Sequence, residues 1–291
     1  MQIKPTTANL NSWIQNYVPE KDLFFLTPDV AKDWIYTKKI LLVPIKEIFN
    51  SSFYTSLEYV NSYEYWNLKN ASHVIIADKK WIETLPKEEQ FRILNTQLQV
   101  ERGLTIPLEF IQQVNEIPSN YIINKNIVIQ KSMWEGMSIK IKEKLLTTLV
   151  YEWWDNGDCI AIPKESPPCL KKFANTFSNI HGGNCLAATI FAISKGQPES
   201  LINEWIDQKT FLEKLKEYNY KLTDDIENLE AKDVVIWKDE NNVIQHAAYH
   251  INAGLFFNKH GQTIFNPWKI LPKNDLYKEW NEYKPLIYRS F

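Results

Sequence analysis

The sequence predicts an α+β protein in which helices precede an antiparallel sheet. Two features of the 291 residues lead to this fold class. Residues 185–193 form one apolar run typical of a buried helix, and residues 234–288 then hold short apolar runs of strand length separated by turn residues. A helical region followed by successive strands, rather than a strict alternation of the two, is typical of α+β folds.

The first part of the chain is expected to mix helices and strands. Residues 86–102 predict a helix with Thr84 as its N-cap and Gly103 as its stop, and residues 107–114 predict a shorter one. The expected strands are short apolar runs, and the last two flank Asn-Lys-Asn as in a hairpin: residues 39–45, 73–77, 121–123 and 127–129.

From residue 138 the apolar spacing is helical, and Asn156-Gly157 is expected to end that helix. Asn184 is expected to cap a helix that begins at Cys185 and stops at Gly196. The remaining helical stretches and strands are expected, in order, at residues 200–206, 211–218, 234–238, 243–251, 255–258, 263–265 and 286–288.

The length of the chain favours two domains, which we place at residues 1–135 and 136–291. The first is a mixed α/β domain that would shape a substrate groove. The second carries the residues that predict chemistry.

Composition excludes several classes of function. With 33 Lys and Arg against 35 Asp and Glu the net charge is −2, which argues against nucleic acid as a partner. The apolar runs are too short for a membrane span, and no apolar stretch follows Lys4, so a cytoplasmic protein without a secretory signal is expected. Three widely spaced Cys fit neither a disulfide framework nor a zinc site, and we expect no cofactor.

Cys185 is the candidate nucleophile. A Cys that opens a helix points its sulfur at unpaired N–H groups and the positive end of the helix dipole, which favour the thiolate. Gly182 and Gly183, in a chain with only 8 Gly, would let a substrate backbone approach, and the N–H of Cys185 could stabilise an oxyanion. The alternative is a small buried residue without chemistry.

His246 is the candidate base. In a strand, Ile244, His246, Ala248 and His250 share one face, and the small Ala beside the His leaves room for a facing helix or a substrate. His246 and His250 lie roughly 13 Å apart along a strand, too far to bind one metal. The alternative is a hydrogen-bonded core His.

A third residue is expected to orient the imidazole. Ile251 is expected to pair with Leu255 across a tight turn. Under that register Asn258 and His260 both lie on the face of His246, one diagonal to it and one directly opposite. Either could hold the ring in the required tautomer.

Asn266, in Phe-Asn-Pro-Trp, is a further candidate for this role, although a turn Asn before Pro is the favoured interpretation. Asn258, His260 and Asn266 therefore all remain open as partners of His246.

Residues of this region resemble the C-terminal half of the NlpC/P60 papain-like cysteine peptidases. The similar segments are Asp233-Val-Val-Ile-Trp, His246-Ala-Ala-Tyr, Gly254 to Gly261 and, upstream, Asn184-Cys-Leu-Ala-Ala, all within residues 180–268. The resemblance implies a Cys-bearing helix packed on an antiparallel sheet that bears the His, with a triad of Cys185, His246 and Asn258. The family's Asp-Cys-Ser-Gly is Asn-Cys-Leu-Ala here, so a peptidoglycan substrate does not follow.

These observations predict a thiol hydrolase of the peptidase or amidase type, which cleaves an amide, peptide or related acyl bond through a thioester. The substrate would be a peptide or a small amide or acyl compound. Two alternatives remain open. An acyltransferase or transpeptidase would pass the same thioester to an amine, and a non-catalytic binding module would use the 11 Trp and 14 Tyr for recognition.

Overall fold

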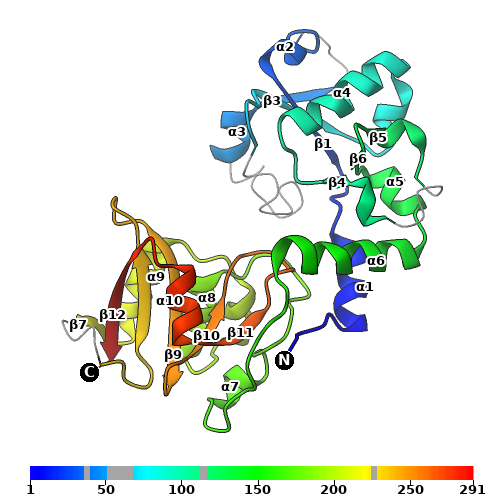
Figure 1. Cartoon of the computed structure of the whole chain (residues 1–291). Coiled ribbons are helices and arrows are strands. Elements are labelled where there is room, and N and C mark those ends of the chain that lie inside the picture. The colour runs from blue at the N-terminus through cyan, green and yellow to red at the C-terminus, as the bar shows by residue number, and fades with distance from the viewer. Residues whose placement is uncertain (36–39, 51–67, 112–116, 224–227, 291) are drawn as a thin grey trace. The chain divides into compact units, whose positions relative to one another are not determined.

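The computed structural model describes residues 1–35, 40–50, 68–111, 117–223 and 228–290 (Figure 1). Its contacts divide the chain into two compact units. The N-terminal unit is Leu10–Leu149, and the C-terminal unit joins Met1–Asn9 to Val150–Phe291. The helix over Ile139–Leu149 (α6) thus belongs to the N-terminal unit, whereas the sequence-based division lies at residue 135.

The N-terminal unit contains two small antiparallel sheets. The first has the order β1-β3-β2 and the second the order β4-β6-β5. The side-chain amide of Gln97, on α4, bonds both the N–H and the carbonyl of Phe25 in β1, which fixes this helix on the first sheet. The strands are β1 (Asp22–Leu26), β2 (Leu41–Pro44), β3 (His73–Ala77), β4 (Thr105–Pro107), β5 (Ile122–Ile123) and β6 (Asn126–Val128).

The helices that accompany these sheets are mostly short. The α-helices are α1 (Thr7–Asn16), whose first turn belongs to the C-terminal unit, α2 (Pro28–Ala31), α3 (Ile45–Asn50), α4 (Lys87–Gln99), α5 (Lys131–Gly136) and α6. Single 3₁₀ turns lie at Trp81–Thr84, Leu108–Phe110 and Ser119–Tyr121.

The sequence predicts the strand at residues 73–77 and the hairpin of β5 and β6 correctly. Asn124 and Lys125 both have positive φ, 47° and 62°, as the two central residues of a type I′ turn require. The predicted cap of the helix at residues 86–102 is wrong. Thr84 bonds the carbonyl of Trp81 instead, and Pro86 occupies the cap position of α4.

Two other expectations in this unit are met only in part. The strand expected at residues 39–45 is β2, which is followed directly by α3, and residue 39 lies outside the described residues. The helix expected at residues 107–114 is reduced to one 3₁₀ turn at Leu108–Phe110, and residues 112–116 lie outside the described ranges.

The C-terminal unit is built on a six-stranded antiparallel sheet with the order β11-β10-β9-β8-β12-β7. The helix α8 (Cys185–Ile193) packs on it, so the α+β class and the packing of the Cys-bearing helix on an antiparallel sheet are confirmed. The strands are β7 (Tyr220–Thr223), β8 (Val234–Lys238), β9 (Ile244–Asn252), β10 (Leu255–Lys259), β11 (Trp268–Pro272) and β12 (Lys284–Ser290). The other helical segments are a π-helical turn at Val150–Trp154, α7 (Pro168–Lys171), a 3₁₀ turn (η7, Glu199–Asn203), α9 (Gln208–Glu217) and α10 (Lys273–Glu279).

The prediction of a strand at residues 263–265 is wrong. These residues form a turn, and the next strand, β11, begins at Trp268. The turn closes around a buried amine, because Lys259 Nζ donates to the carbonyls of Thr263 and Asn266. Hydrogen bonds from the Lys259 side chain to backbone carbonyls thus stand where the apolar run Thr263-Ile-Phe265 predicts hydrogen bonds between strands.

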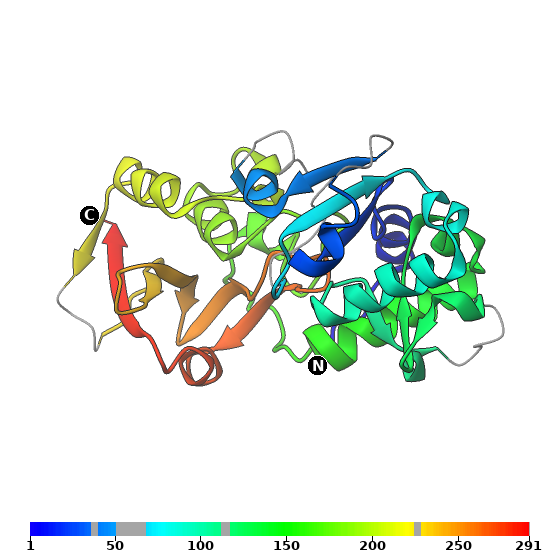
Figure 2. The same ribbon diagram turned by 90° about the horizontal axis from the view of Figure 1, so that it is seen from above.

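The two faces of the sheet are covered by different helices (Figure 2). Leu186 to Ile193 of α8 are all buried, and they pack on the face that carries Ala247, Tyr249 and Ile251 of β9. The opposite face carries Trp237 and Ala248 and is covered by Leu276 of α10. Strand β9 is therefore buried on both faces along most of its length.

We expect Ile190→Ala to destabilise the C-terminal unit by about 2–5 kcal/mol, because the side chain is fully buried in α8 and its removal leaves a cavity. The matched control is Ile180→Ala, whose side chain is 49% exposed and should change stability by less than about 0.5 kcal/mol. Urea denaturation followed by circular dichroism measures both. Equal losses in the two variants would contradict the central place of α8.

Candidate functional site

The N-terminus of α8 forms as the sequence predicts. Asn184 is the N-cap, and its Oδ1 accepts a hydrogen bond from the N–H of Ala187 at 2.9 Å. Its amide Nδ2 donates to the carbonyl of Ile206 at 2.8 Å. Cys185 therefore stands at the first helical position, half-buried, with both ends of the capping side chain fixed.

The two glycines before Cys185 are explained by packing within the chain. A Cβ on Gly183 would lie 2.3 Å from the carbonyl oxygen of Ile202 in η7, and one on Gly182 would lie 2.7 Å from that of Asn203. Gly182 also has φ +124°, which side chains disfavour. The Gly pair is expected to let a substrate backbone approach, but the backbone that lies against it is that of η7.

The structure brings His246 and Asn258 together. His246 Nε2 lies 2.6 Å from Asn258 Oδ1, and both side chains are buried. The register is the expected one, with Phe257 opposite Tyr249, although a bulge at Leu255 shifts the first pair by one residue. Among the described residues the β9–β10 ladder ends at the Phe257 pair, so Asn258 stands just beyond it on the His246 side of the sheet.

The other two candidates for the orienting role have different partners. His260 stacks over His246 with ring centroids 5.6 Å apart, and its Nδ1 lies 2.7 Å from Glu279 Oε1. Asn266 Oδ1 accepts from the Thr263 hydroxyl at 2.6 Å and so closes the turn. Of the three residues, Asn258 is the one that hydrogen-bonds the imidazole.

His246 is enclosed by aromatic rings. Trp280 stacks on it at 4.3 Å with the two planes 5° apart, and Trp237 lies 5.6 Å away. Burial lowers the pKa of His246 well below its usual value, the charge of His260 acts in the same direction, and the hydrogen bond to Asn258 opposes both. Among the described residues Nδ1 is buried without a hydrogen-bond partner.

Cys185 approaches β9 from the opposite side. The helix that carries it packs on the Ala247 face, whereas His246 packs with Trp237 and Trp280 on the other. The sulfur interacts with the backbone N–H of Ala247, the residue next to His246. The structure thus brings the thiol to the peptide beside the imidazole, and within the described ranges no hydrogen bond joins the two side chains.

The ionisation of the thiol differs from the sequence-based expectation. Burial raises the pKa of Cys185 to about 11, and the N–H groups of Ala247, Leu186 and Cys185 itself act in the other direction without overcoming it. The helix N-terminus therefore does not make a resting thiolate. Cys185 and His246 are both neutral at pH 7.

A third titratable group, Lys259, lies on the Cys185 side of the sheet, and no sequence motif predicts it there. Its side chain is 1% exposed, its Nζ bonds the Thr263 carbonyl at 3.0 Å, and it lies 5.3 Å from the Trp268 ring centroid. Lys259 interacts electrostatically with both Cys185 and the buried His181. In the strand Leu-Phe-Phe-Asn-Lys, Lys259 comes two residues after Phe257 and therefore points to the same face of the sheet. This alternation is the sequence signal that could have placed Lys259 in the core.

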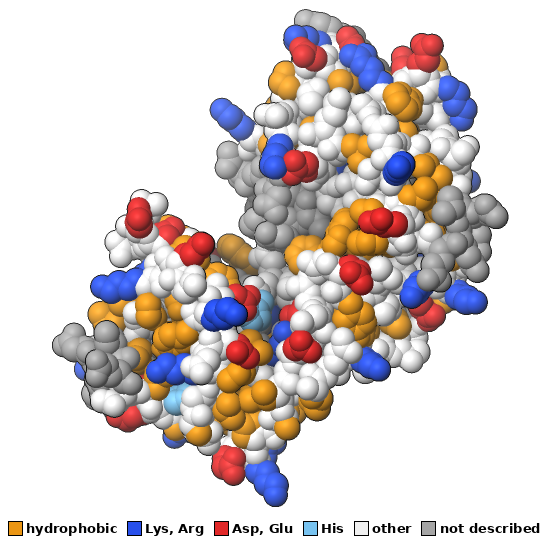
Figure 3. All heavy atoms as spheres, in the orientation of Figure 1, with side chains coloured by type: hydrophobic (Ala, Val, Ile, Leu, Met, Phe, Trp, Pro, Cys, Tyr) orange, Lys and Arg blue, Asp and Glu red, His pale blue; other side chains and the backbone are white. Residues whose placement is uncertain are grey.

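The described residues contain no group of three His, Cys, Asp or Glu side chains that could hold a metal ion. Within the same residues no helix is both long enough and apolar enough to span a bilayer. Basic and acidic side chains are interspersed on the face in view in Figure 3, rather than gathered into a field of one sign.

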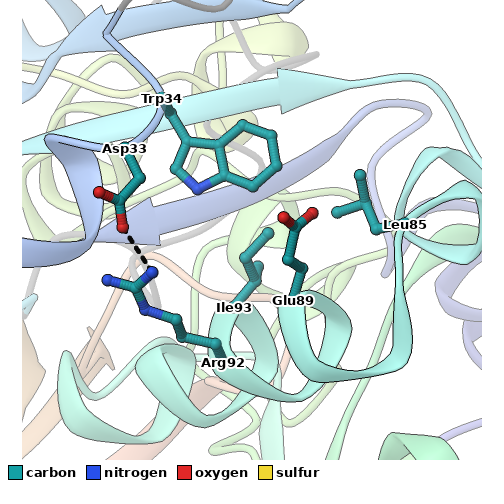
Figure 4. Close-up of a pocket in the computed structure, with 6 residues that line it drawn as sticks. All are labelled: Asp33, Trp34, Leu85, Glu89, Arg92 and Ile93. Atoms are coloured by element: carbon teal, nitrogen blue, oxygen red, sulfur yellow. Dashed lines mark hydrogen bonds and ion pairs between the residues drawn. The ribbon is translucent and has the colours of Figure 1, made fainter.

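A surface cavity of about 190 Å³ lies in the N-terminal unit (Figure 4). Arg92 and Asp33 form an ion pair at 2.5 Å at its edge, and Trp34 and Glu89 line it. The pair neutralises itself, so the cavity presents an indole and one carboxylate. These groups do not assemble a nucleophile with a base.

Comparison of the chain with protein-family models, with curated proteins and with solved structures finds no match.

We expect Gly183→Ala to destabilise the C-terminal unit by about 1–3 kcal/mol, because its Cβ would overlap the Ile202 carbonyl and force η7 and the Cys185 loop apart. Gly136→Ala is the control. A Cβ there meets nothing within 4 Å, so the change should be neutral or stabilising by up to about 1 kcal/mol. Denaturant titration of both variants checks this, and an unaffected Gly183 variant would show that the loop moves freely.

A second prediction concerns pH. Because the pKa of His246 is lower in the folded state than its usual 6.5, the stability of the folded state is full above pH 6.5 and falls below it. Against His246→Gln, which keeps an N–H donor for Asn258, wild-type stability should fall by about 1.4 kcal/mol more per pH unit below 6.5. Denaturation at pH 5.5 and 7.5 measures the difference. Parallel pH dependences would mean that His246 is solvated.

Proposed function

We propose that the C-terminal unit is a cysteine-dependent hydrolase that cleaves an amide or related acyl bond through a thioester at Cys185. One observation carries the proposal. Asn258 holds His246 through Nε2 at 2.6 Å and leaves Nδ1 without a partner among the described residues, while the Cys185 sulfur meets the backbone N–H of Ala247, the next residue of the same strand. A structural core His would be expected to use both ring nitrogens.

The hydrogen bond to Asn258 selects the tautomer. The amide oxygen Oδ1 is an acceptor, so Nε2 carries the proton and Nδ1 carries the lone pair of the neutral ring. A neutral imidazole with its lone pair on a buried nitrogen can accept one proton. This is the role of the base in a Cys-His-Asn arrangement.

The resting pair is neutral, so the proton moves during attack. Cys185 and His246 lie on opposite faces of β9 at rest, so attack requires the sulfur to come within proton-transfer reach of the imidazole. As the Cys185 sulfur then bonds the carbonyl carbon, His246 Nδ1 takes the thiol proton, and the carbonyl electrons form an oxyanion that the N–H of Cys185 stabilises. The imidazolium then protonates the leaving amine. In the second half, water attacks the thioester, His246 takes its proton, and the acid leaves as the thiol is restored.

Access to the site is from the Cys185 side. Trp280 covers the imidazole and His246 is fully buried, whereas Cys185 is only half-buried. A peptide or small acyl substrate therefore meets the sulfur first. Its carbonyl carbon must come within bonding reach of Sγ while the proton passes to Nδ1.

A second candidate function is a non-catalytic binding module. The raised pKa of the Cys185 thiol and the full burial of His246 favour it, because both groups are neutral and enclosed at pH 7. In this case the His246–Asn258 pair would serve as a core hydrogen bond.

The test is hydrolysis of a panel of dipeptide p-nitroanilides and p-nitrophenyl esters. We expect Cys185→Ala and His246→Ala to lower turnover by about 10²–10⁴-fold, and Asn258→Ala by less but more than His260→Ala. Cys169→Ala, which removes another half-buried Cys, is the control and should leave turnover unchanged. Acid quenching followed by intact-mass measurement should show an acyl adduct on Cys185.

Two outcomes would overturn the proposal. If Cys185→Ala retained wild-type turnover, or no compound of the panel were turned over or left an adduct, the binding module would be the better account. Product analysis with added glycine amide separates hydrolysis from transfer, because an amide product would show that an amine replaces water.

A further inference from the structure

We propose that Lys259 is a positioning residue that sets the ionisation of the Cys185 thiol by exchanging a proton with it inside the α8 face of the sheet. The inference deepens the proposed function and rests on it for its role in catalysis. Its test reads thiol reactivity and needs no turnover.

The position of Lys259 follows from the end of β10. Lys259 pairs with Trp268 in β11 and points to the same face of the sheet as Phe257, two residues before it. Its side chain therefore lies on the face on which α8 packs. Neighbouring Asn258 points to the opposite face, where it holds His246. Two adjacent residues at one strand end thus serve the two sides of the candidate site.

The amine is anchored in a way that suits both of its protonation states. Nζ donates to the carbonyls of Thr263 and Asn266. A neutral amine has two N–H donors, which these carbonyls satisfy, and a lone pair remains. Within the described residues Lys259 has no carboxylate at ion-pair distance that would fix its charge. Burial therefore lowers the pKa of Lys259 to about 7, against the attraction of Asp155 and the Cys185 thiolate.

Several other charged and titratable groups lie around Lys259. His181, on the loop before α8, has its pKa lowered to about 4 by burial and by Lys259. Asp155 is bound to Lys269 at 2.7 Å. On the other face, burial lowers the pKa of His246 well below 6.5, and beside it His260 lies against Glu279.

The exchange is balanced within the pair. A thiol and a neutral amine become a thiolate and an ammonium as one proton passes from Sγ to Nζ, and no other reactant is needed. Because the two groups interact, we expect the pair to lose its two protons in two separate steps whose pKa values belong to the pair rather than to either group. The thiolate–ammonium form is therefore a constant fraction of the protein between these values.

The experiment is the rate of Cys185 alkylation by iodoacetamide from pH 5.5 to 11, read by peptide mapping. In the wild type we expect a rise near pH 7, a plateau, and a second rise near pH 11. Cys159 and Cys169 in the same samples serve as internal references. They should lack the first rise, because no described interaction links either thiol to Lys259.

Two variants test the amine itself. Lys259→Met should lose the first rise and react about tenfold or more slowly at pH 8, as a thiol pKa that is one unit higher requires. Lys259→Arg keeps the charge but cannot accept a proton, so its profile should rise once, at a lower pH than the Met variant. Lys142→Met removes a buried Lys of the N-terminal unit and should leave the profile of Cys185 unchanged.

A single wild-type rise above pH 9, or a Lys259→Met profile identical to the wild type, would overturn the inference. If that variant does not fold, the wild-type profile together with the ¹⁵N titration of Lys259 Nζ by NMR decides, and a midpoint near 10.5 would overturn it. Hydrolysis that depends on Cys185 with a single-step alkylation profile would refute the inference and leave the proposed function intact. A two-step alkylation profile with no hydrolysis of the panel would support the role of Lys259 and refute the proposed hydrolase function.

Discussion

The packing of α8 on strand β9 is the contact on which the C-terminal unit depends. The helix is apolar on every side from Leu186 to Ile193, so it is stable only when surrounded, and the sheet, η7 and α9 enclose it. Because α10 covers the other face, β9 is buried on both sides. The alternation of its side chains then decides which residues can meet, and it separates Cys185 from the imidazole face.

Burial on both faces also governs the electrostatics. The imidazole of His246 and the amine of Lys259 are removed from water and the thiol of half-buried Cys185 is largely shielded from it, which disfavours the charged form of each. The pKa of the acid therefore rises and the pKa values of the two bases fall. The thiol and the imidazole of such a site are neutral at rest, and charge develops on them only when a proton moves between members of the site.

The end of β10 links the two faces. The ladder with β9 stops at Phe257, and the next two residues leave it in opposite directions. Asn258 satisfies His246, and Lys259 holds the following turn through two carbonyls. Substitutions in this short segment thus affect the orientation of the imidazole, the closure of the loop and the environment of the thiol.

The sequence by itself determined the α+β class, the cap and start of α8, the bounds of β8 and the hairpin turn at Asn124-Lys125, because each depends on local patterns such as capping, apolar runs and turn residues. It also placed Asn258 on the face of His246 as one of three candidate partners, since the turn after β9 fixes the register and hence the diagonal pair, and the tertiary structure then selected Asn258. Only the tertiary structure decided that α8 packs on the Ala247 face, that burial outweighs the helix dipole at Cys185, and that Lys259 is buried beside it. Each of these depends on which distant element covers a surface, and the local pattern does not contain that information.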